Sequence, residues 1–286
     1  MKITTILAAA SVLALTACGP EAGSAYENEA AEAAEDTALN EVLADARRDE
    51  DRARDEFRNP AKTLAFFQVA PDQTILEYAP GGGWYTRILA PYTSENGGYV
   101  AVGFAPEGIE ALPENFRVQV REGGENFAAN QSEALGIDAQ KLPFHFGNEV
   151  PDELDGTVDR VLMIRMMHNL IRWGIAESEI AALRDSMKPD GLLGVVQHRA
   201  KADAPEEYVD GNMGYLKEAD LIAFFEANGF ELVDSSEINA NPNDTADYEN
   251  GVWTLPPSFA LGDEERETFA AIGESDRMTL LFRKAE

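Results

Sequence analysis

Cysteine and histidine are scarce in this chain of 286 residues, which has one cysteine and three histidines. Because Cys18 is alone, the sequence offers no internal disulfide, no cysteine-based metal site and no thiol nucleophile in the mature protein. A zinc or iron site needs three or more converging ligands, and no two histidines have the His-x-x-x-His spacing that pairs ligands on one helix face. We therefore expect no metal centre.

Basic residues are also few, since 23 lysines and arginines stand against 52 aspartates and glutamates, a formal charge of −29. Such a surplus of negative charge repels a nucleic-acid backbone and an anionic membrane surface. We therefore expect no nucleic-acid partner. The acidity itself indicates a well-solvated surface and says little about the fold.

A short apolar run, Ile3–Leu15, occurs at the amino end and follows the positive charge of Lys2. It is too short to span a bilayer as a mature helix and is typical of a signal peptide that is removed on export. The next four residues, Leu15-Thr16-Ala17-Cys18, match a bacterial lipobox, which predicts a signal peptide at 1–17 and lipidation of the cysteine. A chance cysteine after a signal-like segment is the alternative. Because Gly19 replaces the aspartate of inner-membrane lipoproteins, we expect a cell-envelope protein, lipid-anchored at the outer membrane and facing the periplasm.

The composition of the sequence changes near residue 37, where bulky apolar residues become frequent. Residues 18–36 are rich in alanine, glutamate and serine and have too few bulky apolar side chains to order themselves, which predicts an acidic tether. Residues 37–286 are expected to form one domain that begins with a helical extension. Opposite charges at helical spacing up to Phe57 predict a charged helix, and Asn59 is expected to cap the next helix.

The stretch Thr74–Leu89 predicts a strand, a tight glycine loop and a helix. Three consecutive glycines, 81–83, allow the backbone to approach a ligand closely. Glu77, at the carboxyl end of the strand, is placed to accept hydrogen bonds from ribose hydroxyls. This arrangement is typical of a nucleotide-binding loop, although a glycine turn without a ligand has the same pattern.

Further apolar segments alternate with helical patterns along the chain. This alternation predicts an α/β fold whose sheet is mostly parallel and covered by helices on both faces. The strands expected after the glycine loop are Tyr99–Phe104, Phe116–Val120, Val158–Ile164, Leu192–Val196, Phe230–Ile238 and Arg277–Arg283.

From about Arg52 to Lys284 the sequence resembles class I S-adenosylmethionine-dependent methyltransferases. More narrowly, it resembles a group of predicted bacterial, exported lipoprotein-type methyltransferases with a Gly-Gly-Gly-Trp-Tyr-Thr loop. The segments that carry the resemblance are Glu77–Leu89, Lys188–Arg199, Ser235–Pro242, Gly251–Pro257 and Ile272–Met278.

The resemblance implies a Rossmann-like sheet of seven strands with an antiparallel last strand. It also implies S-adenosylmethionine as cofactor, lying over the carboxyl ends of the first two strands. The cofactor-binding residues implied by the matching motif are Glu77, Ala79, Pro80, Gly81, Gly82, Gly83, Trp84, Tyr85 and Gly103.

Two positions depart from the family pattern. Ala79 stands where the motif usually has its first glycine. The second strand ends in Gly103-Phe104, where the family usually has an acid that binds both ribose hydroxyls, and Glu107 is the candidate to replace that acid. An empty, vestigial cleft is the alternative to a bound cofactor.

Polar side chains follow the fourth and fifth expected strands, where the family fold places substrate-facing residues. Methyl transfer needs an acceptor in line with the sulfonium and, for a protonated acceptor atom, a base with a near-neutral pKa. His168, Asn169 and His198 are therefore the predicted catalytic residues. The alternative for each histidine is a hydrogen-bonded rim residue that fixes a loop.

The long segment before the last strand is expected to be a lid or recognition segment. The resemblance favours a substrate-side role for it, although loops dense in asparagine and aspartate are equally often plain turns. Arg277 is expected to pair with Asp276 or Glu274 rather than with an anionic substrate. The predicted substrate-binding residues are Arg199, Glu237, Asn239, Asn241 and Trp253.

These patterns predict an S-adenosylmethionine-dependent methyltransferase with a small-molecule or unidentified acceptor, held at the membrane through Cys18. The lipobox and the cofactor conflict, because S-adenosylmethionine is made in the cytosol. The alternative is a non-catalytic, periplasm-facing lipoprotein that uses the same cleft for another small ligand or for a partner.

Overall fold

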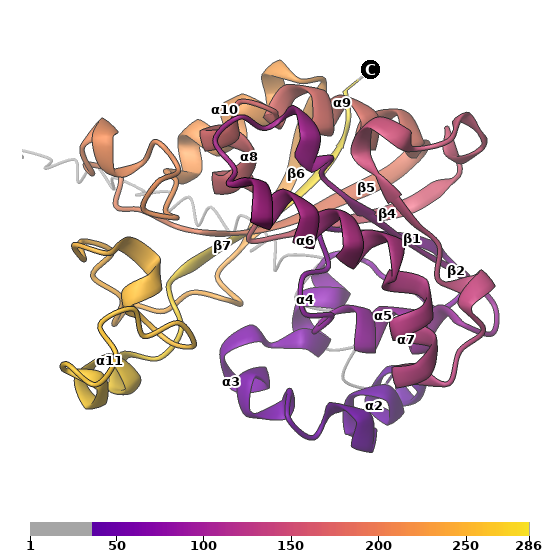
Figure 1. Cartoon of the computed structure of the whole chain (residues 1–286), viewed down its shortest axis with the longest axis horizontal. Coiled ribbons are helices and arrows are strands. Elements are labelled where there is room, and N and C mark those ends of the chain that lie inside the picture. The colour runs from indigo at the N-terminus through magenta and orange to yellow at the C-terminus, as the bar shows by residue number, and fades with distance from the viewer. Residues whose placement is uncertain (1–35, 286) are drawn as a thin grey trace, which may run out of the picture.

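A computed structural model describes residues 36–285 of the chain (Figure 1). The predicted signal peptide at 1–17, Cys18 and all of the predicted tether except Asp36 lie outside the described residues. No helix within 36–285 is both long and apolar enough to cross a membrane.

A seven-stranded sheet forms the centre of the molecule, with its strands in the order β3-β2-β1-β4-β5-β7-β6. β7 runs antiparallel to both of its neighbours, and the other four pairs are parallel, which confirms the predicted fold class. The strands are β1 Thr74–Tyr78, β2 Gly98–Gly103, β3 Phe144–Phe146, β4 Val158–Ile164, β5 Met187–His198, β6 Phe230–Ser236 and β7 Arg277–Lys284.

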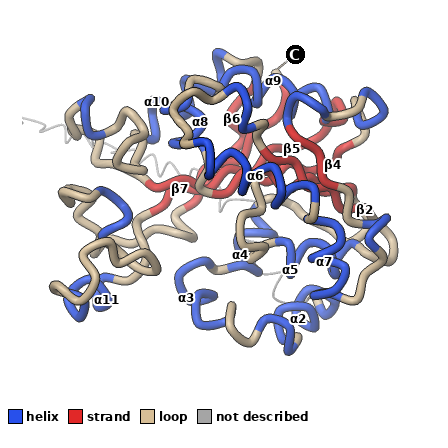
Figure 2. Tube along the Cα trace, in the orientation of Figure 1, coloured by secondary structure: helices blue, strands red, loops and turns tan. Residues whose placement is uncertain are grey.

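Helices cover both faces of this sheet, which crosses the molecule in Figure 2. Side chains of α8, α9 and α10 join one buried cluster, and side chains of α2, α4, α5 and α7 join the cluster on the other face. The helices are α2 Thr37–Ala44, α3 Asp55–Arg58, α4 Pro60–Phe66, α5 Thr86–Thr93, α6 Glu114–Glu125, α7 Phe127–Leu135, α8 Met167–Trp173, α9 Ala176–Ser186, α10 Glu218–Ala227 and α11 Arg266–Ile272.

The strands show the two-residue period of a sheet that is buried on both sides. In β1, Leu76 and Tyr78 join the cluster under α8–α10, whereas Ile75 joins the cluster under α5. Glu77 has the same parity as Ile75, so its carboxylate is directed into the layer of α5. The order of strands reverses between β1 and β4, and open α/β sheets bind ligands at such a reversal.

The predicted strand at Phe116–Val120 is wrong, because these residues belong to helix α6. Five alternating residues are too few to distinguish the two-residue period of a strand from the 3.6-residue period of a helix. The helix also continues through two glycines, 123 and 124. Gly124 is required there because a Cβ would stand 2.4 Å from the Phe146 ring and 2.5 Å from the Phe144 ring. The third strand is instead the three-residue β3.

The single charged helix predicted before Phe57 is broken into short pieces. Asp45 ends α2 and caps a 3-10 turn by accepting a hydrogen bond of 2.8 Å from the Arg47 amide. Arg48 in that turn is fully buried against Trp84 and pairs with Asp55 at 2.7 Å. Arg48 therefore points inward, whereas Arg47 and Arg52 stay at the surface and pair with Asp45 and Asp49.

Asn59 precedes α4 as expected but does not cap it. Its backbone is left-handed, with φ of 41°, and its side chain makes no capping hydrogen bond. The Asn59 amide instead donates to the Ile238 carbonyl at 2.8 Å, so it links the amino-terminal extension to the loop after β6.

Candidate functional site

Two adjoining cavities open over the carboxyl ends of β1, β2 and β4. One, of about 580 Å³, has mainly apolar walls, and we term it the apolar cavity. The other, of about 390 Å³, is lined by several charged side chains, and we term it the polar cavity. The two form one site because they share seven lining residues, namely Ala79, Pro80, Gly81, Met166, His168, Asn169 and Trp253.

The glycine loop separates the two cavities and has an unusual backbone. Ala79, Gly81 and Gly83 have φ of 51°, 55° and 75°, in the left-handed region that glycine tolerates best. Gly82 does not have a left-handed φ, and a Cβ added to it would meet no atom within 4 Å. The main chain at Gly82 is therefore open to a ligand, as the sequence pattern predicts for a nucleotide loop.

Glu77 is held inside the protein rather than in the apolar cavity. Its side chain is 3% exposed, and its Oε2 accepts hydrogen bonds from the hydroxyls of Thr86 at 2.7 Å and Tyr99 at 2.6 Å. It borders the polar cavity only. The hydrogen bonds that we expected from a ribose thus come from the protein's own side chains.

Burial raises the pKa of Glu77 to about 7, although the hydrogen bonds from Tyr99 and Thr86 and the charge of Arg87 act in the opposite direction. A carboxyl whose pKa is raised on folding stabilises the folded state at low pH. Its contribution is fully present below the unfolded value of 4.5 and is lost as the pH rises through about 7.

We therefore expect Glu77→Gln, which mimics the protonated acid, to be more stable than the wild type at pH 8 and equal to it near pH 4.5. The shift from 4.5 to about 7 corresponds to a gain of up to about 3 kcal/mol at pH 8. Urea unfolding at the two pH values measures the difference. Glu107→Gln, on the surface, is the control, and a loss of stability in Glu77→Gln at pH 8 would contradict the expectation.

The two predicted catalytic histidines lie together at the ends of α8 and β5. Their ring centroids are 5.7 Å apart, and both side chains are buried. Nδ1 of His168 lies 3.2 Å from Nε2 of Gln197, and Nδ1 of His198 lies 2.6 Å from Oγ of Ser275. Asn169 borders both cavities beside His168.

The pKa values of these histidines differ from the near-neutral value that a base would need. Burial, together with the charges of Arg172 and Arg165, lowers the pKa of His168 to about 4, although the hydrogen bond with Gln197 acts in the opposite direction. Burial and the neighbouring His168 lower the pKa of His198 as well. Both rings are therefore neutral at pH 7 and available as proton acceptors, but His168 is a weaker base than the sequence suggested.

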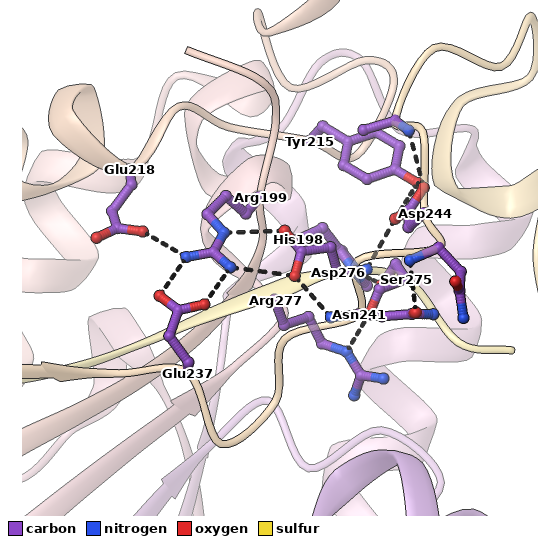
Figure 3. A network of polar contacts seen from close by, with 12 residues as sticks. His198, Arg199, Tyr215, Glu218, Glu237, Asn241, Asp244, Ser275, Asp276 and Arg277 are labelled. Carbon is purple, nitrogen blue, oxygen red and sulfur yellow. Dashed lines mark hydrogen bonds and ion pairs between the residues drawn. The ribbon is translucent and has the colours of Figure 1, made fainter. Parts of the chain in front are cut away.

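Trp253 is the predicted substrate-side residue that reaches the site, where it borders both cavities. The other four predicted substrate-binding residues border neither cavity and have partners within the protein. Arg199 lies within 3.0 Å of Glu218, 2.6 Å of Glu237 and 2.9 Å of Asp276, as Figure 3 shows.

The two asparagines of this group also serve the fold. The amide of Asn239 donates to the hydroxyls of Thr63 and Thr279, each at 3.0 Å. The amide of Asn241 donates to the carbonyls of Ile272 at 2.8 Å and Glu274 at 2.6 Å. These bonds fasten the loop after β6 to α4 and to the start of β7.

Sequence reasoning missed the arginines of the polar cavity, namely Arg54, Arg58, Arg87 and Arg165. The local density of arginines could have indicated Arg54 and Arg58. Residues 47–58 contain five arginines in a chain with only 23 basic residues. Arg165 follows β4 and has no such marker. Within the described residues no three histidine, cysteine, aspartate or glutamate side chains are grouped to hold a metal ion.

No protein-family model matches the chain, and no curated protein matches it in sequence. Solved structures do resemble it. The cyclase SpnF has a TM-score of 0.50 at 16% identity, over 80% of each chain. An S-adenosylmethionine-dependent methyltransferase from Aquifex aeolicus has a TM-score of 0.46 at 19% identity, over 70% of this chain and 93% of the other.

A third such structure is the Burkholderia thailandensis 1,6-didemethyltoxoflavin-N1-methyltransferase, with bound 1,6-didemethyltoxoflavin and S-adenosylhomocysteine. It has a TM-score of 0.47 at 14% identity, over 92% of this chain and 91% of the other. At such low identities the likeness concerns the fold and leaves the activity to be argued from the site.

Proposed function

We propose that this chain binds S-adenosylmethionine and transfers its methyl group to a small-molecule acceptor. The observation that carries the proposal is the two-part site at the reversal of strand order. There an open glycine loop stands between an apolar cavity and a polar cavity, with His168 and Asn169 bordering both. The sequence resemblance of the loop to class I methyltransferases supports the same assignment.

The apolar cavity suits the adenosine part of the cofactor. Phe104, Phe127 and Phe144 give it aromatic walls. Gly103 also lines it, and a larger residue does not fit there because a Cβ would stand 2.6 Å from the Phe144 ring. Glu107 does not supply the ribose-binding acid, because it is exposed and pairs with Arg121. Gln119 is an uncharged polar side chain in this wall that can bond the ribose hydroxyls.

The bound cofactor would supply an electrophilic methyl group on a sulfonium, so the protein has mainly to position the acceptor. His168 and Asn169 lie where the two cavities meet and can orient the acceptor atom. The neutral His168 ring can accept a proton from that atom. Trp253 borders both cavities at the same junction.

The test is calorimetric titration of the purified protein with S-adenosylmethionine and S-adenosylhomocysteine. We expect saturable binding of each at one site per chain. If neither ligand produced binding heat, the methyltransferase proposal would be rejected.

The second candidate is a binding function in the same cleft without methyl transfer. It is favoured by one observation, the lack of an acid in the wall of the apolar cavity where the family usually binds the ribose. In that case the protein would bind another small ligand or a partner. For either function we propose lipid anchoring at Cys18 and a location facing the periplasm, and labelling with radioactive lipid followed by cell fractionation tests this location.

A further inference from the structure

Beside the polar cavity, one carboxylate contacts three arginines, and a fourth arginine lines the cavity nearby. Glu274, which is 4% exposed, lies 2.6 Å from Nε of Arg54, 3.2 Å from Nε of Arg58 and 2.9 Å from Nη2 of Arg277. Arg165 lines the same cavity and has no ion pair with any described residue. One carboxylate therefore balances only one of four guanidinium charges.

The other acids at this wall do not make up the difference. Asp51 is engaged by Arg87, whose Nε lies 2.5 Å from its Oδ2. Glu77 accepts hydrogen bonds from two hydroxyls, and its raised pKa leaves it partly protonated at neutral pH. The polar cavity thus carries a surplus of positive charge in a chain whose net charge is −29.

Several donors of these arginines are buried and lack a partner among the described residues. They are Nη2 of Arg54, Nη2 of Arg58 and Nε of Arg165. Arg58 is only 3% exposed, so its unpaired donor is costly in the absence of a ligand. A ligand with acceptor atoms in the polar cavity would satisfy these donors.

The backbone at this wall is also strained. Arg165 directly follows β4 in the left-handed region, with φ of 58°. Its amide is fixed by a hydrogen bond of 2.6 Å to the Val196 carbonyl. A non-glycine residue is held in this conformation only when the surrounding structure requires it, and such residues cluster at ligand sites.

We propose that Arg54, Arg58 and Arg165, backed by Arg277, bind a multiply charged anionic group of the acceptor, either a phosphate or a pair of carboxylates. The assignment of the anion to the acceptor rests on the proposed methyl transfer. The existence of the anion site does not depend on that proposal. Guanidinium groups bind both anions through paired hydrogen bonds. The amino-acid end of S-adenosylmethionine fits less well, because its single carboxylate is accompanied by an ammonium and a sulfonium that the surplus positive charge repels.

Inorganic phosphate is the probe. We expect calorimetry to show that phosphate binds the protein, and that it binds equally well when the protein is saturated with S-adenosylhomocysteine. Arg165→Gln should weaken phosphate binding at least tenfold and change the affinity for S-adenosylhomocysteine less than threefold. Because this variant removes a like charge and leaves no carboxylate unpaired, its melting temperature without ligand should equal or exceed that of the wild type.

Arg283→Gln is the matched control, since it removes the same charge from an exposed arginine of β7 that pairs with Glu231. It should bind phosphate like the wild type. If circular dichroism shows Arg165→Gln to be unfolded, Arg54→Gln makes the same comparison, because its side chain is 28% exposed.

Four results would overturn the proposal: no phosphate binding, an equal binding heat from chloride at the same ionic strength, equal weakening of phosphate binding in the Arg283→Gln control, or displacement of phosphate by S-adenosylhomocysteine. The last would assign the arginines to the cofactor's own carboxylate. If phosphate binds but S-adenosylhomocysteine does not, the methyltransferase proposal fails while the anion site stands.

Discussion

Replacing Glu274 by alanine is expected to lower the free energy of unfolding by about 3–5 kcal/mol, the usual cost of removing one partner of a buried ion pair. The Glu274 carboxylate contacts three guanidinium groups, and the side chains of Arg58 and Arg277 are each only 3% exposed. Without it these charges stay buried beside one another with no counter-ion. Urea unfolding at pH 7 measures the loss.

Glu237→Ala is the matched control for this prediction. Glu237 lies 2.6 Å from Arg199, but its side chain is 70% exposed and Arg199 keeps two other carboxylates. We expect this substitution to change the unfolding free energy by less than about 1 kcal/mol. Phosphate should restore part of the stability of Glu274→Ala, because an anion bound only by the folded state stabilises it. Equal losses in the two variants would contradict the structural account.

Gly82→Arg is expected to weaken binding of S-adenosylhomocysteine at least about 100-fold, a loss of about 3 kcal/mol in binding free energy. The fold should tolerate the change, because a Cβ at Gly82 meets no atom within 4 Å and the backbone is not left-handed. The new side chain stands at the polar cavity that Gly82 borders and blocks the approach of a ligand to the main chain of the loop. Calorimetry of the folded variant measures the effect.

Gly108→Arg controls for the added side chain and charge. A Cβ at Gly108 would also meet no atom within 4 Å, and the backbone there is not left-handed, but Gly108 borders neither cavity. This variant should bind S-adenosylhomocysteine like the wild type. Wild-type affinity in Gly82→Arg would mean that the glycine loop does not contact the cofactor.

The core of the sheet was predictable from local patterns. Apolar runs such as Tyr99–Phe104 and Val158–Ile164 become strands buried on both sides, as their composition requires. Phe116–Val120 was assigned the wrong period because a five-residue alternation fits either element when the partner surface is unknown. Of the predicted site, His168, Asn169 and His198 reach the cavities because they follow or end parallel strands, whose carboxyl ends meet at one edge. Trp253 reaches them from the 3-10 turn Gly251–Thr254, which lies in the long segment between β6 and β7.

The functions of charged residues were much less predictable than the strands. Arg199 follows β5, where a substrate-facing residue is expected, yet it is neutralised by Glu218, Glu237 and Asp276 from three other segments. Nothing in the residues next to Arg199 indicates these partners. An ion pair depends on distance in space, and the sequence does not state that distance for residues far apart in the chain.

The sequence by itself determined six of the seven strands, their alternation with helices and the open glycine loop, because these follow from hydrophobic period and from glycine's backbone freedom within a few residues. Only the tertiary structure decided which charges are compensated. Arg54 and Glu274 are 220 residues apart in the chain and 2.6 Å apart in space. The surplus of arginine charge in the polar cavity can be recognised only from the three-dimensional positions of all the charged groups. The reason is that the charge of an arginine is neutralised by the carboxylates near it in space, wherever they lie in the sequence.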